Sequence, residues 1–87
     1  MKKIWTDDGW YDYLYWQAQD KKTLKKINEL IKDIERNGLL TGIGKPEKLK
    51  YRNNQYSRRI DQTNRLIYSI DSSENIIIYS CRGHYSE

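Results

Sequence analysis

The sequence KKTLKKINELIKDIER, residues 21–36, carries the most regular apolar pattern in the chain and decides the fold. Its apolar side chains recur three and four residues apart: Leu24, Ile27, Leu30, Ile31 and Ile34. Side chains at these spacings lie on one face of an α-helix, and the lysines between them fall on the opposite face. Asn37-Gly38 follows, and glycine readily adopts the left-handed conformation that ends many helices. The stretch therefore predicts an amphipathic helix with one buried face.

A second helix is predicted on the N-terminal side, over residues 9–19. Thr6, Asp7 and Asp8 are good N-cap candidates, and the two carboxylates suit the positive end of a helix dipole. Bulky side chains crowd residues 10–16, so the pattern does not assign a buried face to this helix. Residues 3–5, before the cap, are predicted as a short strand. Asp20 with Lys21 marks a tight connection between the two helical stretches, so we expect an antiparallel helical hairpin.

After Gly38 the apolar pattern becomes typical of strands. Strands are predicted at residues 48–51, 56–61, 65–70 and 75–82, after a glycine-rich connection at residues 39–46. A strand, two helices and then a strand meander predict an α+β fold. We expect a single domain over residues 1–87, with both helices packed on one face of a twisted, largely antiparallel sheet.

The composition is basic and rich in aromatic side chains that carry polar groups. The 87 residues have a formal net charge of +4 and include eight Tyr and three Trp but no Phe. A positive charge attracts polyanions, and Tyr and Trp suit contact surfaces, so RNA is the first substrate class to consider. Cys81 is the only cysteine, which excludes a disulfide framework. With no apolar export segment and no long apolar run, we expect a cytoplasmic protein without a membrane span.

The only histidine, His84, directly follows the strongly strand-like residues 75–81 and Arg82-Gly83. Histidine can donate and accept protons near neutral pH, and a strand end would hold it in place for such chemistry. The ordinary alternative for a residue so near the C-terminus is a frayed tail. One His and one Cys lack the spacing of a zinc site, so we expect neither a metal nor a cofactor.

Three arginines, Arg58, Arg59 and Arg65, fall on neighbouring predicted strands. Because side chains alternate along a strand, Arg58 and Arg59 point to opposite faces. Pairing Asp61 with Arg65 would place Arg59 and Arg65 on one face, whereas a two-residue turn at residues 63–64 would separate them. The pattern leaves both registers open. The arginines are either solvated charges on the sheet, which is the commoner case, or a cluster that binds phosphate.

Glu47 lies among Lys45, Lys48 and Lys50, directly after Pro46. Nearby cations favour the ionised carboxylate, which suits a proton acceptor better than a proton donor. From these residues alone, the preferred interpretation is an ordinary exposed ion pair.

Several segments nevertheless occur together in a familiar order: Trp5, YLYWQ at 13–17, KKINELIK at 25–32, GKPE at 44–47, SRRI at 57–60, RLIY at 65–68 and CRGHY at 81–85. Over essentially the whole chain they closely resemble the YoeB/Txe toxins of the RelE-like superfamily of bacterial toxin–antitoxin modules. The resemblance implies a compact α+β domain with two helices against a twisted antiparallel sheet. It also implies a ribosome-dependent endoribonuclease that cleaves mRNA in the decoding site and is neutralised by a YefM-like antitoxin.

The resemblance further implies roles for six residues: Glu47, Arg65 and His84 as catalytic residues, and Lys50, Arg59 and Tyr85 as RNA-binding residues. The implied partners are the antitoxin, ribosomal RNA and mRNA, and a homodimer is allowed. Two departures from the family pattern concern the C-terminal end. Gly83 stands where relatives often carry an aromatic residue, and Ser86-Glu87 follows the tyrosine at which relatives often end.

Two other functions remain open. One is a non-catalytic RelE/ParE-like toxin, such as a gyrase inhibitor, and the other is a plain RNA-binding module. Either would act by binding alone and would not need Glu47, Arg65 and His84. Retention of all three therefore favours the nuclease.

Overall fold

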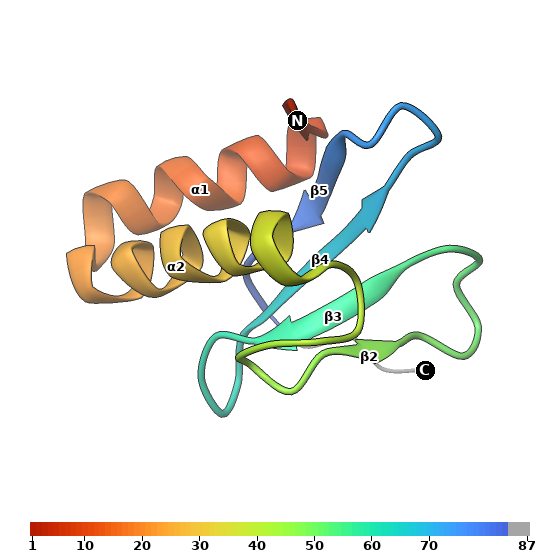
Figure 1. Ribbon diagram of the computed structural model, residues 1–87. Helices are drawn as coiled ribbons and strands as arrows, with labels where there is room; N and C mark the ends of the chain where they lie inside the picture. Colours follow the sequence, from red (N-terminus) through yellow and green to blue (C-terminus); the bar gives the residue numbers. More distant parts are fainter. Residues whose placement is uncertain (84–87) are drawn as a thin grey trace.

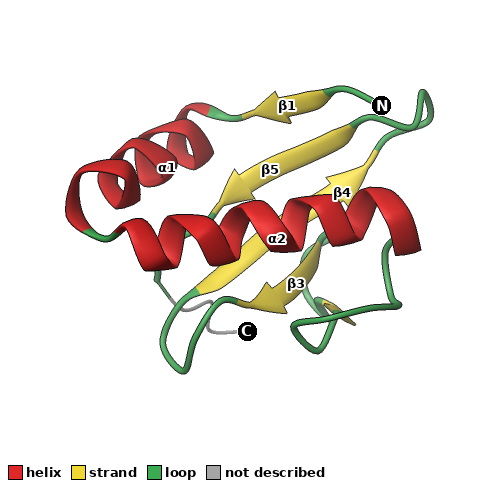
Figure 2. Ribbon diagram, turned by 60° about the vertical axis from the view of Figure 1, so that its left-hand side comes forward, coloured by secondary structure: helices red, strands yellow, loops and turns green. Residues whose placement is uncertain are grey.

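The computed structural model describes residues 1–83, in which two helices pack on one face of a five-stranded sheet (Figure 1 and Figure 2). In chain order the elements are β1 (Lys3–Trp5), α1 (Asp7–Gln19), α2 (Lys21–Asn37), β2 (Glu47–Lys48), β3 (Tyr56–Arg59), β4 (Arg65–Ile70) and β5 (Ile76–Ser80). The predicted α+β class and the order of elements are confirmed. Within the described range, no helix is both long and apolar enough to cross a membrane.

The start of α1 is set by a cap and a glycine. Thr6 Oγ1 accepts a hydrogen bond from the Gly9 amide at 3.1 Å, and Asp7 and Asp8 fill the first turn. The helix therefore begins two residues earlier than predicted, because the carboxylates follow the cap and do not form it. Gly9 is buried against β5, where a Cβ would lie only 2.5 Å from the Ile78 carbonyl oxygen. Glycine thus allows the helix to approach the sheet closely.

The predicted apolar face of α2 packs into the core. Its buried residues are Ile27, Leu30, Ile31 and Ile34. The Asp20 carboxylate caps the N-terminus by accepting the amide of Lys22 at 3.0 Å. At the other end the Gly38 amide donates to the Ile34 carbonyl at 2.8 Å, with a Gly38 φ of +88°. The prediction for residues 21–36 is confirmed, with one further residue, Asn37, at the end.

The strand order is β1-β5-β4-β3-β2, and of the four strand pairs only β1–β5 is parallel. The sheet is therefore largely antiparallel, as predicted. Three predicted strands are shorter in the structure because the chain turns early. After β2, the Leu49 amide bonds to the Gln55 carbonyl at 2.9 Å and so begins a turn. After β5, the Cys81 amide donates to the Asp12 carboxylate of α1 at 3.0 Å.

The third early turn follows β3. The Asp61 carboxylate accepts the amides of Thr63 at 2.8 Å and Asn64 at 2.7 Å, which folds residues 61–64 into a tight connection. Asp61 is therefore a turn residue and was wrongly predicted as part of the strand.

The two faces of the sheet differ. Leu66, Tyr68, Ile76 and Ile78 belong to the core that α2 covers. Side chains alternate along a strand, and residues paired across strands share a face. Ser57, Arg59, Arg65 and Ile67 therefore lie on the opposite face. The candidate site residues of β3 and β4 are thus held on the face that the helices leave uncovered.

Candidate functional site

Three strands bring Glu47, Ser57 and Arg65 together. Glu47 lies opposite Ser57 in the β2–β3 register, and Arg65 is the first residue of β4. Arg65 Nη1 donates to Glu47 Oε1 at 2.9 Å and to Ser57 Oγ at 3.4 Å. The Glu47 side chain is 58% exposed and that of Arg65 is 17% exposed, so solvent reaches the carboxylate more easily than the guanidinium. An accessible base and a cation are in contact at this point.

Arg59 and Arg65 share a face of the sheet. They lie directly opposite each other in the β3–β4 pair, with residues 60–64 between them. The Ile60 amide donates to the Asn64 carbonyl at 2.9 Å and closes this connection. The sequence left two registers open, and the structure agrees with the one that placed Arg59 and Arg65 on the same face. The predicted pairing within that register is wrong, because Arg59 and not Asp61 pairs with Arg65.

The two arginines and Glu47 leave the cluster with a positive charge. Like charges directly across a strand pair repel each other, and an anion bound between them would relieve that repulsion. Among residues 1–83, the side chains that bond to Arg65 contact only Nη1. Nε and Nη2 therefore have no side-chain partner within that range. A guanidinium can bind two phosphate oxygens in a forked arrangement, although the Arg65 side chain is only 17% exposed in this structure.

Lys50 is less closely associated with this cluster. It is exposed in the turn that follows β2, and the structure records no bond from it to Glu47, Arg59 or Arg65. A long, flexible side chain at this place can attract RNA without touching the other site residues.

The described chain ends beside Arg65. The Gly83 amide donates to Asn64 Oδ1 at 2.8 Å, and its carbonyl accepts the Arg65 amide at 3.1 Å. The role of Asn64 was not predicted from the sequence, because a side chain that forms a hydrogen bond between a loop and a distant segment leaves no periodic signal. His84 and Tyr85, the next two residues of the sequence, lie outside the described residues.

Cys81 is a core residue and not a nucleophile. Its side chain is fully buried. Burial, aided by the nearby Asp12 carboxylate, raises the pKa of the Cys81 thiol to about 12. At neutral pH the reactive thiolate is therefore essentially absent.

Arg58 is not a solvated charge, and that interpretation is wrong for this residue. Its side chain is completely buried on the helix-facing side, where it pairs with Asp33 of α2. Two sequence signals could have indicated this. Arg58 shares a strand face with Ile60, which is buried, and Asp33 directly precedes Ile34 of the buried helical face. An anion and a cation at the edge of the same core favour a buried ion pair.

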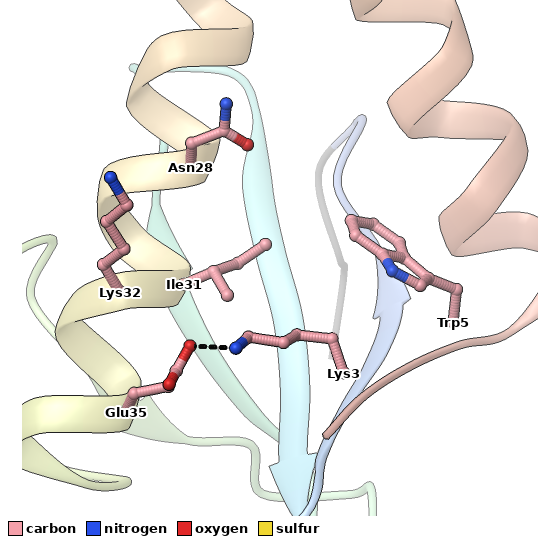
Figure 3. Close-up of a pocket in the computed structure, with 6 residues that line it drawn as sticks. All are labelled: Lys3, Trp5, Asn28, Ile31, Lys32 and Glu35. Atoms are coloured by element: carbon pink, nitrogen blue, oxygen red, sulfur yellow. Dashed lines mark ion pairs between the residues drawn. The ribbon is translucent and has the colours of Figure 1, made fainter. Parts of the chain in front are cut away.

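A separate groove of about 400 Å³ lies between β1 and α2 (Figure 3). Trp5 and Ile31 supply apolar surface, and the Lys3 side chain reaches across to an ion pair with Glu35. None of the candidate site residues that the structure describes, Glu47, Lys50, Arg59 and Arg65, lines this groove. It is therefore distinct from the cluster around Glu47 and Arg65.

Comparison with known proteins identifies the family. A family model described as the YoeB-like toxin of bacterial type II toxin-antitoxin systems matches residues 5–85. This chain belongs to the YoeB-like toxin family. This match confirms the resemblance noted in the sequence. Its range includes the six residues to which the resemblance assigned roles, and those roles stay predictions.

Individual members of the YoeB-like family agree in sequence and fold. Toxin YoeB of Escherichia coli is 49% identical over 86 residues, covering 98% of this chain and 100% of the relative. The YoeB dimer of Staphylococcus aureus is 49% identical with a TM-score of 0.91, and its coverage is 98% of both chains. A YoeB-YefM complex from the same organism is 49% identical with a TM-score of 0.88 and the same coverage. The described residues therefore have the YoeB-like fold.

Proposed function

We propose that this chain is a ribosome-dependent endoribonuclease that cleaves mRNA in the decoding site and so inhibits translation. The observation that best supports the proposal is the contact of the exposed Glu47 carboxylate with Arg65, with Arg59 opposite Arg65. A carboxylate can remove a proton from a ribose hydroxyl, and arginines can stabilise the charge that develops on a phosphate. Membership of the YoeB-like toxin family supports the same function.

In the proposed mechanism, Glu47 accepts the proton of a ribose 2′-hydroxyl, whose oxygen attacks the adjacent phosphorus. The bond from phosphorus to the 5′ oxygen breaks, and His84 donates the proton that this leaving oxygen needs. Arg65 binds the phosphoryl oxygens as their negative charge grows. One product ends in a 2′,3′-cyclic phosphate and the other begins with a 5′-hydroxyl. These steps use side chains only, and the proposal invokes neither a metal nor a cofactor.

The remaining site residues are proposed to hold the RNA. Arg59 is exposed opposite Arg65 and can bind a phosphate beside the one that reacts. Lys50 attracts the backbone from the turn after β2. Tyr85 stacks on a base of the splayed strand, as aromatic side chains do with single-stranded RNA.

The proposed partners are the ribosome and a YefM-like antitoxin. A close relative from Staphylococcus aureus was solved in a YoeB-YefM complex, and we propose an antitoxin of that type for this chain. An acidic segment that folds on binding would neutralise Arg59 and Arg65 and cover His84. A YoeB from the same organism was also solved as a dimer, and we propose that this chain can form a homodimer.

Mapping of mRNA ends on translating ribosomes tests the proposed function. Addition of the wild-type chain should create new 5′-hydroxyl ends at positions in the decoding site. Glu47→Gln should not create them. Glu35→Gln is the matched control, because it changes a carboxylate of another exposed ion pair, with Lys3. If translation stops while the mRNA ends stay unchanged, the chain acts by binding alone and the nuclease proposal is wrong.

A further inference from the structure

Arg58 is a buried cation whose charge is matched inside the fold. Nη1 contacts the Asp33 carboxylate, and Nε donates to the Tyr68 phenol at 3.0 Å. The hydrogen bond from Arg58 holds the pKa of the Asp33 carboxyl below its usual value, whereas burial raises the pKa of the Tyr68 phenol. Near neutral pH Asp33 is therefore ionised and Tyr68 is neutral, as these contacts require.

The other contacts of Arg58 hold the connection between α2 and β2. Nη1 donates to the Ile43 carbonyl at 3.0 Å, and Nη2 donates to the carbonyls of Gly38 and Thr41, each at 2.8 Å. The Asp33 carboxylate accepts the Ile43 amide at 3.0 Å. An arginine side chain has five N–H donors, and the five acceptors of Arg58 match that number. One buried ion pair thus fixes a segment that has no helix or strand of its own.

The connection lies directly against this ion pair. Gly42 has a φ of +122°, and a Cβ there would lie 1.9 Å from Asp33 Oδ2 and 3.0 Å from Arg58 Nη1. Gly44 has a φ of +82°, and its Cβ would lie 3.2 Å from Arg58 Cβ. The backbone therefore follows the surface of the ion pair, and a displaced guanidinium would displace the connection.

The same connection leads into Glu47. The Gly44 carbonyl accepts the Arg59 amide at 2.7 Å, and three residues later Glu47 pairs with Ser57. In β3, Arg58 lies between Ser57 and Arg59. β3 thus holds the connection between α2 and β2 in two ways. The Arg58 side chain binds it on one face of the sheet, and the backbone neighbours of Arg58 contact it at Gly44 and Glu47.

We propose that Arg58 is a positioning residue for Glu47. By fixing residues 38–46 it sets the place of the Glu47 carboxylate relative to Arg65, and this role rests on the proposed nuclease function. Buried ion pairs can often be replaced by apolar side chains without loss of stability, so fixing geometry is a separate property from stabilising the fold. A displacement of about 1 Å can lower a catalysed rate on the order of 100-fold.

The activity test combines Arg58→Lys with Glu47→Gln in cleavage on ribosomes. Lysine keeps the charge but cannot reproduce the fork of donors. In the wild-type background, Arg58→Lys should lower kcat roughly 10–100-fold with little change in KM. In the Glu47→Gln background, the further loss should be below about threefold, because no carboxylate remains to be positioned. Equal losses in both backgrounds, or an unchanged kcat in Arg58→Lys, would overturn the proposal.

Ile76→Val controls for lost stability in this experiment. It removes one methylene from the core at β5, away from the connection, and should keep the wild-type kcat. A comparable loss of kcat in this variant would show that any destabilisation lowers activity, and it would remove the support for positioning.

Amide hydrogen exchange gives a second readout that does not need cleavage. In Arg58→Lys, the amides of Ile43 and Arg59 should exchange about tenfold faster or more, because both are bonded within this connection. The amide of Ile76, which is bonded to the Lys2 carbonyl beside β1, should exchange at the wild-type rate. Unchanged exchange at Ile43 and Arg59 would overturn the positioning role by itself.

Two further outcomes are distinguishable. If Arg58→Lys does not fold, Asp33→Asn replaces it in both experiments, since it removes the matching charge but keeps an acceptor oxygen. If the wild-type chain does not cleave mRNA, the proposed function fails, while the exchange experiment still decides whether Arg58 holds the connection.

Discussion

The position of the ion pair between Glu47 and Arg65 suggests a role in catalysis more than in the stability of the fold. The two side chains are 2.9 Å apart, and the carboxylate is mostly exposed. Exposed ion pairs contribute about 1 kcal/mol or less to folding, because water and salt screen them. Removing the carboxylate should therefore affect catalysis far more than it affects the free energy of unfolding.

We accordingly expect Glu47→Gln to lower the single-turnover rate of mRNA cleavage on ribosomes about 10²–10⁴-fold, the usual contribution of an acid or base. His84→Gln should lower it by a similar factor. Both rates are measured beside thermal denaturation, with Glu35→Gln as the control. If Tm falls steeply in step with activity, these residues support the fold and the assigned roles are wrong.

Cys81 should be chemically inert in the folded chain. Its buried thiol has a pKa of about 12, so at pH 8 almost none of it is thiolate. We expect mass spectrometry to find no alkylation by iodoacetamide at pH 8 under native conditions and complete alkylation in denaturant. Rapid alkylation of the folded chain would contradict the burial of Cys81.

From the residues alone, the sequence favoured an exposed ion pair for Glu47 and solvated charges for the arginines, and only the family resemblance implied roles for them. The structure brings Glu47, Arg59 and Arg65 to one cluster, and their roles stay predictions. The burial of Arg58 was not predicted, because the face that the helices cover is a property of the whole fold. Its partner Asp33 lies on α2, far away in sequence.

At the scale of elements, the helices were predicted almost to the residue because their apolar period and caps are local. Strand ends were predicted less well, because side-chain acceptors such as Asp61 and Asp12 divert the backbone from the sheet. The parallel pairing of β1 with β5 was not predicted either. A strand of three residues has no period of its own, and its partner lies at the other end of the chain.

The connection between α2 and β2 offers a matched pair of glycine variants. Gly38 and Gly42 both have positive φ, but a Cβ meets nothing within 4 Å at Gly38 and lies 1.9 Å from Asp33 Oδ2 at Gly42. Gly38→Ala should cost about 1–3 kcal/mol through backbone strain alone, because its φ of +88° and ψ of −161° fall in a region that glycine alone adopts readily. Gly42→Ala should cost about 3 kcal/mol or more, because it also displaces the buried ion pair. Urea denaturation measures both, and equal losses would contradict the described packing.

At the scale of the whole molecule, the elements that stabilise the fold and the candidate site lie on different faces of the sheet. The helices and the main hydrophobic cluster lie on one face of the sheet, and the candidate site lies on the other, beside the buried side chains of Ser57 and Ile67. A partner as large as a ribosome or an antitoxin can therefore approach the site without disturbing the core.

We expect a YefM-like antitoxin to block the site directly. In the complex, His84 should be protected from modification by diethyl pyrocarbonate, and segments containing Arg59 and Arg65 should be protected from deuterium exchange. The uncomplexed chain is the reference for both measurements. If cleavage is inhibited while His84 stays fully accessible, the antitoxin acts elsewhere and the steric explanation fails.

The most direct test of the proposed function compares cleavage of one mRNA free in solution and bound in the decoding site, at equal concentrations of the chain. The proposed acid–base set of the chain is small, with one carboxylate in contact with Arg65. We therefore expect it to need a substrate whose 2′-hydroxyl, phosphorus and 5′ oxygen are already aligned. Such alignment is worth roughly 7–11 kcal/mol in the best intramolecular cases. We therefore predict cleavage on ribosomes at least about 10³-fold faster than cleavage of free mRNA, with ribosome binding that weakens as salt rises. Similar rates in the two settings would contradict ribosome dependence and indicate a nuclease that acts alone.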